Sequence, residues 1–137
     1  MDEKSIMIRY ANDKDIDVLV KYDKHIARNE LINIIALKRV IIIKDKEFIG
    51  WLRYNLFWDN TPFMNMLYIL APFRNKGYGA LLVKFFEEEM KKNYNIVLTS
   101  TQDNESAKYF YRYLGYKDIG SFKIPSEEKE LILFKEL

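Results

Sequence analysis

A short loop between an apolar strand and an amphipathic helix is the feature that most constrains this chain. The run Met64–Leu70 is apolar enough for a buried strand, and apolar residues recur at helical spacing from Gly79 to Met90. The loop between them reads Arg74-Asn75-Lys76-Gly77-Tyr78-Gly79-Ala80. Its two glycines let the backbone approach an anion closely, and a starting helix has unpaired N–H groups that can point at phosphate oxygens. The pattern therefore favours a phosphate site, with a simple tight turn as the alternative.

The two best-known phosphate loops do not fit this sequence. A P-loop needs GxxxxGK followed by Ser or Thr, and a dinucleotide fingerprint needs a third small residue three positions after its second glycine. Leu82 stands at that third position. The next expected strand ends at Thr99-Ser100 without the acidic residue that would hold a ribose. The loop must serve another ligand or none.

Length and composition favour one compact domain covering residues 1–137. The chain is 49% hydrophobic and 15% aromatic, which is enough for a substantial core. Its net charge of +2 comes from 22 basic and 20 acidic side chains mixed along the sequence, so a nucleic-acid partner is not expected. No stretch is apolar enough to span a bilayer, and Met1–Lys4 lacks the basic start of a signal peptide. We therefore expect a cytoplasmic protein without a membrane partner.

Two absences exclude whole classes of chemistry. The chain has no cysteine, which excludes disulfides, thiolate nucleophiles and cysteine-ligated zinc. It has a single histidine, His25, which excludes metal sites built from several histidines. We expect no metal centre. His25 could act as a general base, but a surface position is the simpler expectation.

The patterning predicts strands and helices along the whole chain, with a hairpin turn at Asp45-Lys46 and a chain-breaking turn at 59–62. The expected strands are 6–10, 40–43, 48–57, 63–70, 96–98, 116–122 and 131–135. The expected helices are 16–22, 28–37, 79–90 and 104–114. On the third of these helices, Leu81, Leu82, Phe85, Phe86 and Met90 are expected to form the apolar face.

A second constellation follows from Asn104 to Tyr116. Asn104 and Tyr111 are seven residues apart, so on a continuous helix they share one stripe, separated by about 10 Å of rise. Ala107 lies between them and leaves that stripe open. Such a groove suits an extended ligand, with Asn104 holding its amides and Tyr111 at its reactive end. The alternative is that Tyr111 is a packing residue, like the aromatic residues beside it.

Taken together, the two motifs resemble the Gcn5-related N-acetyltransferase (GNAT) family from Ile6 to the final strand. The family's acetyl-CoA signature, Arg/Gln-x-x-Gly-x-Gly/Ala, is matched by Arg74, Gly77 and Gly79. Its later pattern, Asn-x-x-Ala-x-x-x-Tyr-x-x-x-Gly, is matched by Asn104, Ala107, Tyr111 and Gly115. The resemblance implies a mixed α/β (α+β) fold. Its central, mostly antiparallel sheet would have splayed fourth and fifth strands and about four flanking helices.

The resemblance also implies roles for single residues, with acetyl-CoA as co-substrate. Arg74 to Ala80 would bind its pyrophosphate, and Asn104 and Ala107 would contact the cofactor as well. The N–H of Leu67 would face the thioester oxygen and stabilise the oxyanion. The pantetheine arm would pair with main-chain groups of Tyr68, Ile69 and Leu70. The alternative for Met64–Leu70 is an ordinary core strand.

The implied reaction agrees with the absences, because attack of an amine on a thioester needs no protein nucleophile and no metal. It needs an acid for the departing thiolate, and Tyr111 suits this role because a phenol with a pKa of about 10 is protonated at neutral pH. No single residue stands out as the general base that deprotonates the amine, because Phe63 stands where some relatives carry glutamate. The candidates are Asn65, Asp59, Glu30, Tyr68 and a water relay.

The expected acceptor is a primary amine, with a small molecule preferred over a protein or peptide. Trp51 and Tyr54 are expected in the core, while Phe57 and Trp58 are candidates for holding the apolar part of the amine. The alternative from another class is an acyl-CoA-binding module without turnover, motivated by Phe63. The oligomeric state stays open, with a homodimer as one option.

Overall fold

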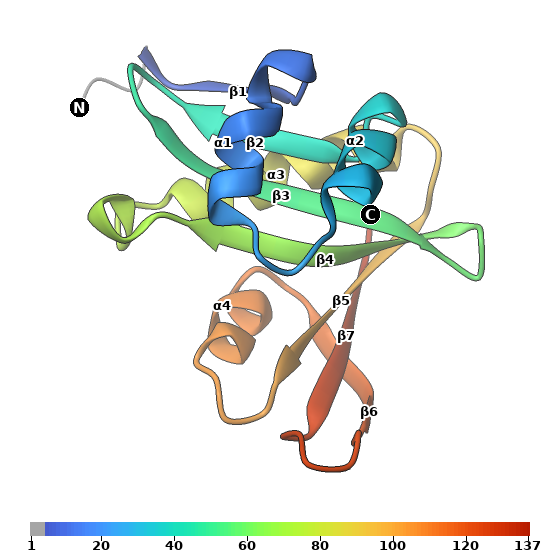
Figure 1. Ribbon diagram of the computed structural model, residues 1–137. Coiled ribbons are helices and arrows are strands. Elements are labelled where there is room, and N and C mark those ends of the chain that lie inside the picture. Colours follow the sequence, from blue (N-terminus) through green and yellow to red (C-terminus); the bar gives the residue numbers. More distant parts are fainter. Residues whose placement is uncertain (1–4) are drawn as a thin grey trace. The chain divides into compact units, whose positions relative to one another are not determined.

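The computed structural model describes residues 5–137 and has the expected mixed fold (Figure 1). Its seven strands follow the order β1-β2-β3-β4-β5-β7-β6. The strands are β1 Met7–Tyr10, β2 Val40–Lys44, β3 Phe48–Phe57, β4 Thr61–Ile69, β5 Ile96–Gln102, β6 Lys117–Phe122 and β7 Glu130–Glu136. The α-helices are α1 Ile16–Tyr22, α2 Arg28–Ala36, α3 Tyr78–Lys91 and α4 Ala107–Tyr113. The predicted fold class is confirmed.

Three element boundaries differ from the sequence prediction by two residues or more. β4 begins at Thr61 and includes Pro62, because proline is tolerated near the start of a strand and the preceding turn is tighter than predicted. β5 continues to Gln102, paired along its whole length with β7. Helix α4 begins at Ala107, since residues 103–106 form a turn in which the Asp103 N–H donates to the Lys129 carbonyl at 2.8 Å.

The contacts divide the chain into two compact units. The first contains the chain up to Tyr54 together with Met66–Phe86, and the second contains Asn55–Asn65 and Glu87–Leu137. The prediction of one domain over residues 1–137 stays a prediction, and the segment Met1–Lys4, on which the signal-peptide argument rested, lies outside the described residues. None of the described helices combines the length and the apolar character that a membrane-spanning helix requires.

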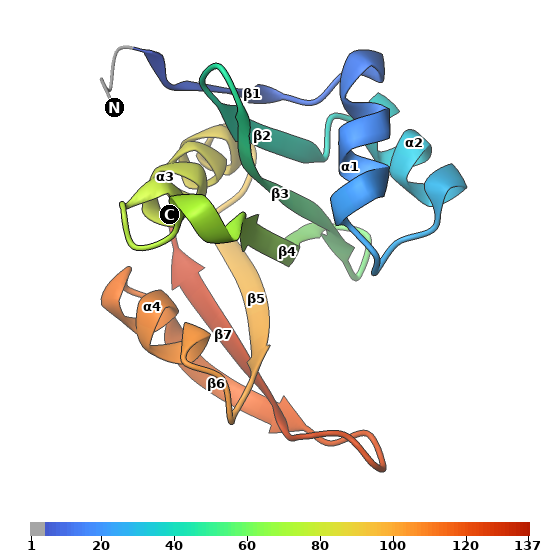
Figure 2. The same ribbon diagram turned by 60° about the vertical axis from the view of Figure 1, so that its left-hand side comes forward.

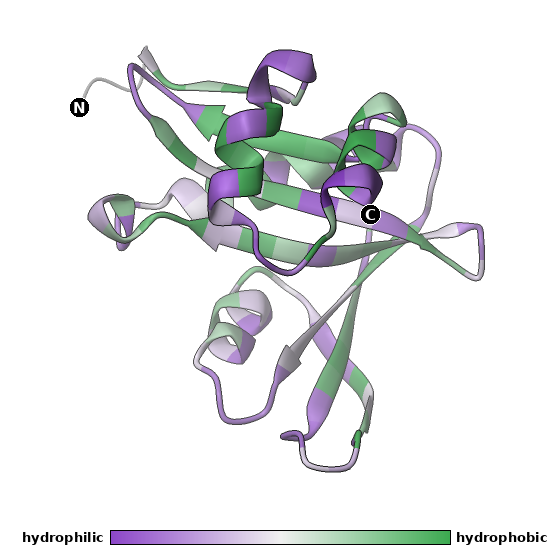
Figure 3. Ribbon diagram, in the orientation of Figure 1, coloured by the Kyte–Doolittle hydropathy of each residue, from purple (hydrophilic) through white to green (hydrophobic). Residues whose placement is uncertain are grey.

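In the first unit, α1 and α2 cover one face of strands β1 to β3, and α3 lies on the other face (Figures 1 and 2). Strand β2 is buried from Val40 to Ile43, which suits a β-branched strand covered on both faces, and it is correspondingly hydrophobic in Figure 3. It pairs antiparallel with β1 and β3. The core beneath the two helices contains Ala11, Leu19, Leu31, Ile34, Ile35, Val40, Ile42 and Trp51.

A buried carboxylate joins the end of α1 to the middle of β3. The Arg53 Nε donates to the Asp23 Oδ2 at 2.7 Å, and the Trp51 indole N–H donates to the same oxygen at 3.0 Å. The Asp23 side chain is 0% exposed and that of Arg53 is 9% exposed. Each charge therefore depends on its partner, because an unpaired charge at this depth has no water to solvate it.

In the second unit, the start of β4 runs parallel to β5. Phe63 lies opposite Leu98, and Met64 lies opposite Thr99. The Thr99 hydroxyl donates to the Met64 carbonyl at 3.0 Å, which adds a side-chain bond to the strand pair. Strand β7 then pairs antiparallel with β5 and β6, and α4 lies against β5 (Figure 1).

Replacing the buried carboxylate should destabilise the protein strongly. We expect Asp23→Ala to lower the free energy of unfolding by about 3–5 kcal/mol, because Arg53 is left buried without a counterion. Asp17→Ala is a matched control on the same helix, since the Asp17 side chain is 96% exposed and its ion pair with Arg28 spans 3.8 Å. This control should stay within about 0.5 kcal/mol of wild type in urea denaturation. Equal losses in the two variants would contradict the account.

Candidate active site

The loop after β4 has the backbone of an anion site. A short 3₁₀ turn, Ala71–Phe73, leads into it, and Asn75 and Gly77 adopt left-handed conformations with φ of 62° and 87°. The Leu81 N–H donates to the Gly77 carbonyl at 3.2 Å. The amides of Gly79 and Ala80, which precede Leu81 in the helix, have no helical carbonyl to pair with. They are therefore available to an anion at the positive end of the helix.

Gly77 is required for its conformation rather than for lack of space. A Cβ placed on it would meet nothing within 4 Å, so the space beside this backbone is open to a ligand. Gly50 in β3 is the opposite case. A Cβ there would lie 2.3 Å from the Tyr68 carbonyl oxygen, so glycine allows the two backbones to approach.

Arg74 is held against the end of β4. Its Nε donates to the Ile69 carbonyl at 2.8 Å, and its guanidinium lies over the Tyr68 ring at 5.0 Å from the centroid. The Leu70 N–H donates to the Ile49 carbonyl at 2.9 Å. Two of the main-chain groups expected to meet the pantetheine arm therefore already have protein partners. The Leu70 N–H is thereby used, whereas the Ile69 carbonyl keeps a second lone pair that could accept from a ligand.

The apolar face of α3 differs in part from the prediction. Leu82, Phe86 and Met90 are buried as expected. Leu81, which was assigned to the same face, is 41% exposed, and Val83 is buried in its place. The helix begins at Tyr78, which is itself buried, and this sets which side chains face the sheet.

Tyr111 lies in α4 and is buried in the second unit. Its ring packs edge-on against those of Phe110 and Tyr116, with centroids 5.3 and 5.6 Å away. Burial raises the pKa of the Tyr111 phenol to about 12; the hydrogen bond with Thr99 opposes this rise and the Glu105 carboxylate adds to it. The phenol is therefore protonated at neutral pH, as a proton donor must be.

The raised pKa also limits how Tyr111 can act. A thiol has an ordinary pKa of about 8.5, so complete transfer of a proton from a phenol of pKa about 12 to a thiolate would cost about 5 kcal/mol. A hydrogen bond that forms as the thiolate leaves has no such cost. If Tyr111 is the acid, this difference in pKa would favour donation in step with departure of the thiolate over transfer to a free thiolate.

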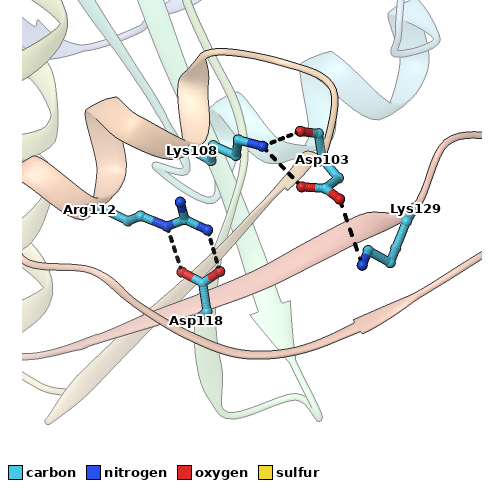
Figure 4. A network of polar contacts seen from close by, with 5 residues as sticks. All are labelled: Asp103, Lys108, Arg112, Asp118 and Lys129. Carbon is cyan, nitrogen blue, oxygen red and sulfur yellow. Dashed lines mark hydrogen bonds and ion pairs between the residues drawn. The ribbon is translucent and has the colours of Figure 1, made fainter.

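Asn104 does not share a helical stripe with Tyr111, so this part of the prediction is wrong. It lies exposed in the turn before α4, whose first residue is Ala107. An ion-pair network, shown in Figure 4, fixes the turn and the helix. Lys108 donates to the Asp103 carboxylate at 3.0 Å, and Arg112 donates to Asp118 through two nitrogens at 3.0 and 2.7 Å.

A large apolar groove, about 740 Å³ in volume, occupies the second unit. It contains Phe57 and Trp58, the two predicted acceptor-binding aromatics, and the candidate base Asn65. Its lining residues are Asn55, Leu56, Phe57, Trp58, Thr61, Phe63, Asn65, Ile96, Leu98, Ser100, Ile119, Phe122 and Ile132. The contributions from β5, β6 and β7 were not expected from the sequence, because the sequence does not show which strands share a face of the sheet.

The remaining candidate bases are dispersed. Asp59 is exposed in the turn before β4, and Glu30 is exposed in the first turn of α2 in the first unit. Tyr68 is 41% exposed beneath Arg74. His25 is exposed, and its backbone N–H donates to Asp23 at 3.2 Å, consistent with the expected surface position.

Comparison with known proteins gives the class of the fold. The model of the acetyltransferase (GNAT) family matches residues 10–116. A GNAT-family acetyltransferase from Bacillus cereus superposes with a TM-score of 0.80 at 22% identity over 96% of each chain. The PaiA N-acetyltransferase from Thermoplasma acidophilum, solved with coenzyme A, superposes with a TM-score of 0.78 at 17% identity, over 97% of this chain and 99% of that one.

A third similar structure is Naa50 from Arabidopsis thaliana in complex with the bisubstrate analogue CoA-Ac-MVNAL. It has a TM-score of 0.76 at 17% identity, over 97% of this chain and 99% of that one. Comparison with curated protein sequences gives no significant match. Because the family model matches most of its length, the chain belongs to the acetyltransferase (GNAT) family.

The glycine loop can be tested by separating backbone strain from crowding. Gly77→Val should lower coenzyme A affinity at least tenfold, because a β-branched residue resists φ of 87° and its side chain fills the open space. Gly77→Asn tolerates the conformation better but still fills the space, so it should bind weakly while unfolding near the wild-type temperature. Calorimetry measures both variants. Gly120→Ala is the control, since a Cβ there also meets nothing and φ is not positive. Wild-type affinity in Gly77→Val would contradict this account of the loop.

Proposed function

We propose that this chain is an acetyl-CoA-dependent N-acetyltransferase that moves the acetyl group directly to a primary amine. Its family membership and the open, left-handed backbone at Gly77 carry the proposal. Similar proteins were solved with the co-substrate or with the coenzyme that it releases: YncA from Salmonella typhimurium with acetyl-CoA, and PaiA with coenzyme A. Loop residues Arg74–Ala80 would hold the pyrophosphate through main-chain amides and the basic side chains of Arg74 and Lys76.

Three groups of this chain would act on the reacting atoms. The Leu67 N–H would stabilise the oxyanion, and the protonated Tyr111 would donate to the departing thiolate. Asn65 would order the water that removes the amine proton. Residues Tyr68 to Leu70, with Asn104 before α4 and Ala107 at its first position, would contact the rest of the co-substrate.

We infer a small-molecule amine as acceptor within one catalytic domain. The peptide alternative has support in a similar protein, because the analogue bound to Naa50 carries the peptide MVNAL. The binding-module alternative rests on Phe63, which supplies no base. Release of free thiol from acetyl-CoA, measured across a panel of amines and short peptides, distinguishes a small-molecule acceptor, a peptide acceptor and a binding module. Tight coenzyme A binding with no thiol release for any acceptor would favour the binding module.

The role of Tyr111 is tested by removing one oxygen atom. Tyr111→Phe should lower kcat by about ten- to a thousand-fold, with coenzyme A affinity near wild type, because the variant loses its proton donor. Tyr113→Phe makes the same change on the same helix at a residue that is 88% exposed, and it should leave kcat unchanged. Equal kcat in wild type and Tyr111→Phe would end the catalytic role.

The pH dependence provides an independent check on the same group. An enzyme that needs a protonated acid loses activity as the pH rises through the pKa of that acid. Burial raises the pKa of Tyr111 to about 12. Wild-type kcat should therefore show no descending limb between about pH 8 and pH 10. A descending limb centred near pH 9 that disappears in Tyr111→Phe would contradict a buried, raised phenol.

A further inference from the structure

The apolar groove lies on the opposite face of the β4–β5 pair from Tyr111. Side chains alternate between the two faces of a strand. Leu98 and Ser100 line the groove, while Thr99 between them is buried on the other face, where it interacts with Tyr111. An acceptor in the groove and an acid at Tyr111 would thus approach the strand pair from opposite sides.

Strand β4 connects residues of the groove with the proposed oxyanion donor along the chain. Phe63 and Asn65 contribute side chains to the groove from this strand. Leu67 follows Asn65 by two residues in the same strand, about 7 Å along it. Among the polar residues that line the groove, Asn65 is thus the nearest in sequence to Leu67, the proposed oxyanion donor.

The chemistry of the lining points to one kind of ligand. Among the described residues, the side chains that line the groove include no carboxylate, ammonium, guanidinium or imidazole group. Polyamines and charged peptides would therefore find no counter-charge on these walls. Phe122 and Ile119 are 50% and 54% exposed, so apolar surface is open to a ligand of matching character. A volume of about 740 Å³ is within the range of small-molecule sites.

Trp58 is the most unusual residue of the groove. It is 78% exposed, and it adopts φ of 55° in the turn that Asn60 closes by donating to the Phe57 carbonyl at 3.2 Å. Such turn positions favour glycine or asparagine, and a bulky residue is disfavoured there. The conformation holds the indole against the Phe57 ring, with centroids 4.7 Å apart. An exposed aromatic pair held against backbone preference is a feature of ligand sites.

We propose that the apolar groove binds the carbon skeleton of the acceptor, which is a primary amine on an aromatic or branched aliphatic body without a second charge. This inference rests on the proposed acetyl transfer and specifies its substrate class. The same chemistry is found in small monoamines and in the first residue of a peptide with an apolar N-terminus. Trp58, Phe57 and Phe122 would contact the body, while Asn65 faces the amine end.

Competition between two amines of similar head group measures the preference. With saturating acetyl-CoA, kcat/KM for 2-phenylethylamine should exceed that for ethanolamine about ten- to a hundred-fold, because the groove desolvates a phenyl group. Phe122→Ser should reduce this ratio about tenfold. Ile124→Ser is the matched control, since Ile124 is 56% exposed on the same unit but does not line the groove. Equal rates for the two amines, or a ratio unchanged by Phe122→Ser, would overturn the proposal.

A binding measurement separates failure of the groove from failure of the enzyme. The chain has two tryptophans, of which Trp51 is 1% exposed, so a change in fluorescence on adding 2-phenylethylamine should come from Trp58 and be lost in Trp58→Phe. Saturable quenching without thiol release would refute acetyl transfer but keep the amine site. Thiol release from polar amines without quenching would keep the enzyme and refute the groove assignment.

Two further experiments test whether the groove binds a peptide or a second copy of this chain instead of a small amine. A short peptide with N-terminal methionine that outcompetes 2-phenylethylamine, and loses its advantage in Phe122→Ser, would support the groove and assign its ligand to polypeptides. Analytical ultracentrifugation tests a second copy of this chain as the occupant. A dimer that dissociates on Trp58→Ser would overturn the proposal, because the groove would then be a subunit interface.

Discussion

The parallel pairing of β4 with β5 is the interaction on which the candidate site depends. The Thr99 hydroxyl donates to the Met64 carbonyl and fixes the register of the pair. Because side chains alternate along β5, this register sends Thr99 towards Tyr111 and its neighbours Leu98 and Ser100 into the apolar groove. A shift of one residue would exchange the two faces. One hydrogen-bonded pair thus separates the proposed acid from the proposed acceptor surface.

The chemistry that we propose needs few side chains, because main-chain groups can do much of the work. Amine attack on a thioester requires an oriented pair of substrates, a donor to the oxyanion and a proton for the thiolate. Main-chain amides can supply the oxyanion donor and the phosphate contacts. Burial keeps the Tyr111 phenol protonated over the whole physiological range of pH. Specificity then falls to the groove, where Trp58 and Phe122 are exposed and no charged side chain contributes to the described lining.

Local patterns could predict most strands and helices, because short-range spacing determines them, and the family resemblance added the fold class. The roles of the glycine loop and of Tyr111 stay predictions. Properties set by contacts between distant residues could not be predicted. The Asp103 N–H donates to the carbonyl of Lys129, which lies 26 positions further along the chain. Because this bond holds residues 103–106 in a turn, α4 begins only at Ala107 and Asn104 lies outside it. The Asp23–Arg53 pair joins residues separated by 30 positions, and no local pattern marks either as buried. The groove likewise combines β4 with β6 and β7.

Steady-state kinetics with both substrates varied tests direct transfer to the amine. If the acetyl group moves in a single complex, plots of reciprocal rate against reciprocal amine concentration at several acetyl-CoA concentrations should intersect. Mass spectrometry of the protein incubated with acetyl-CoA alone should then show no covalent acetyl group at the active site. Parallel lines, together with an acetylated protein that passes its acetyl group to added amine, would contradict direct transfer and require a nucleophile on this chain.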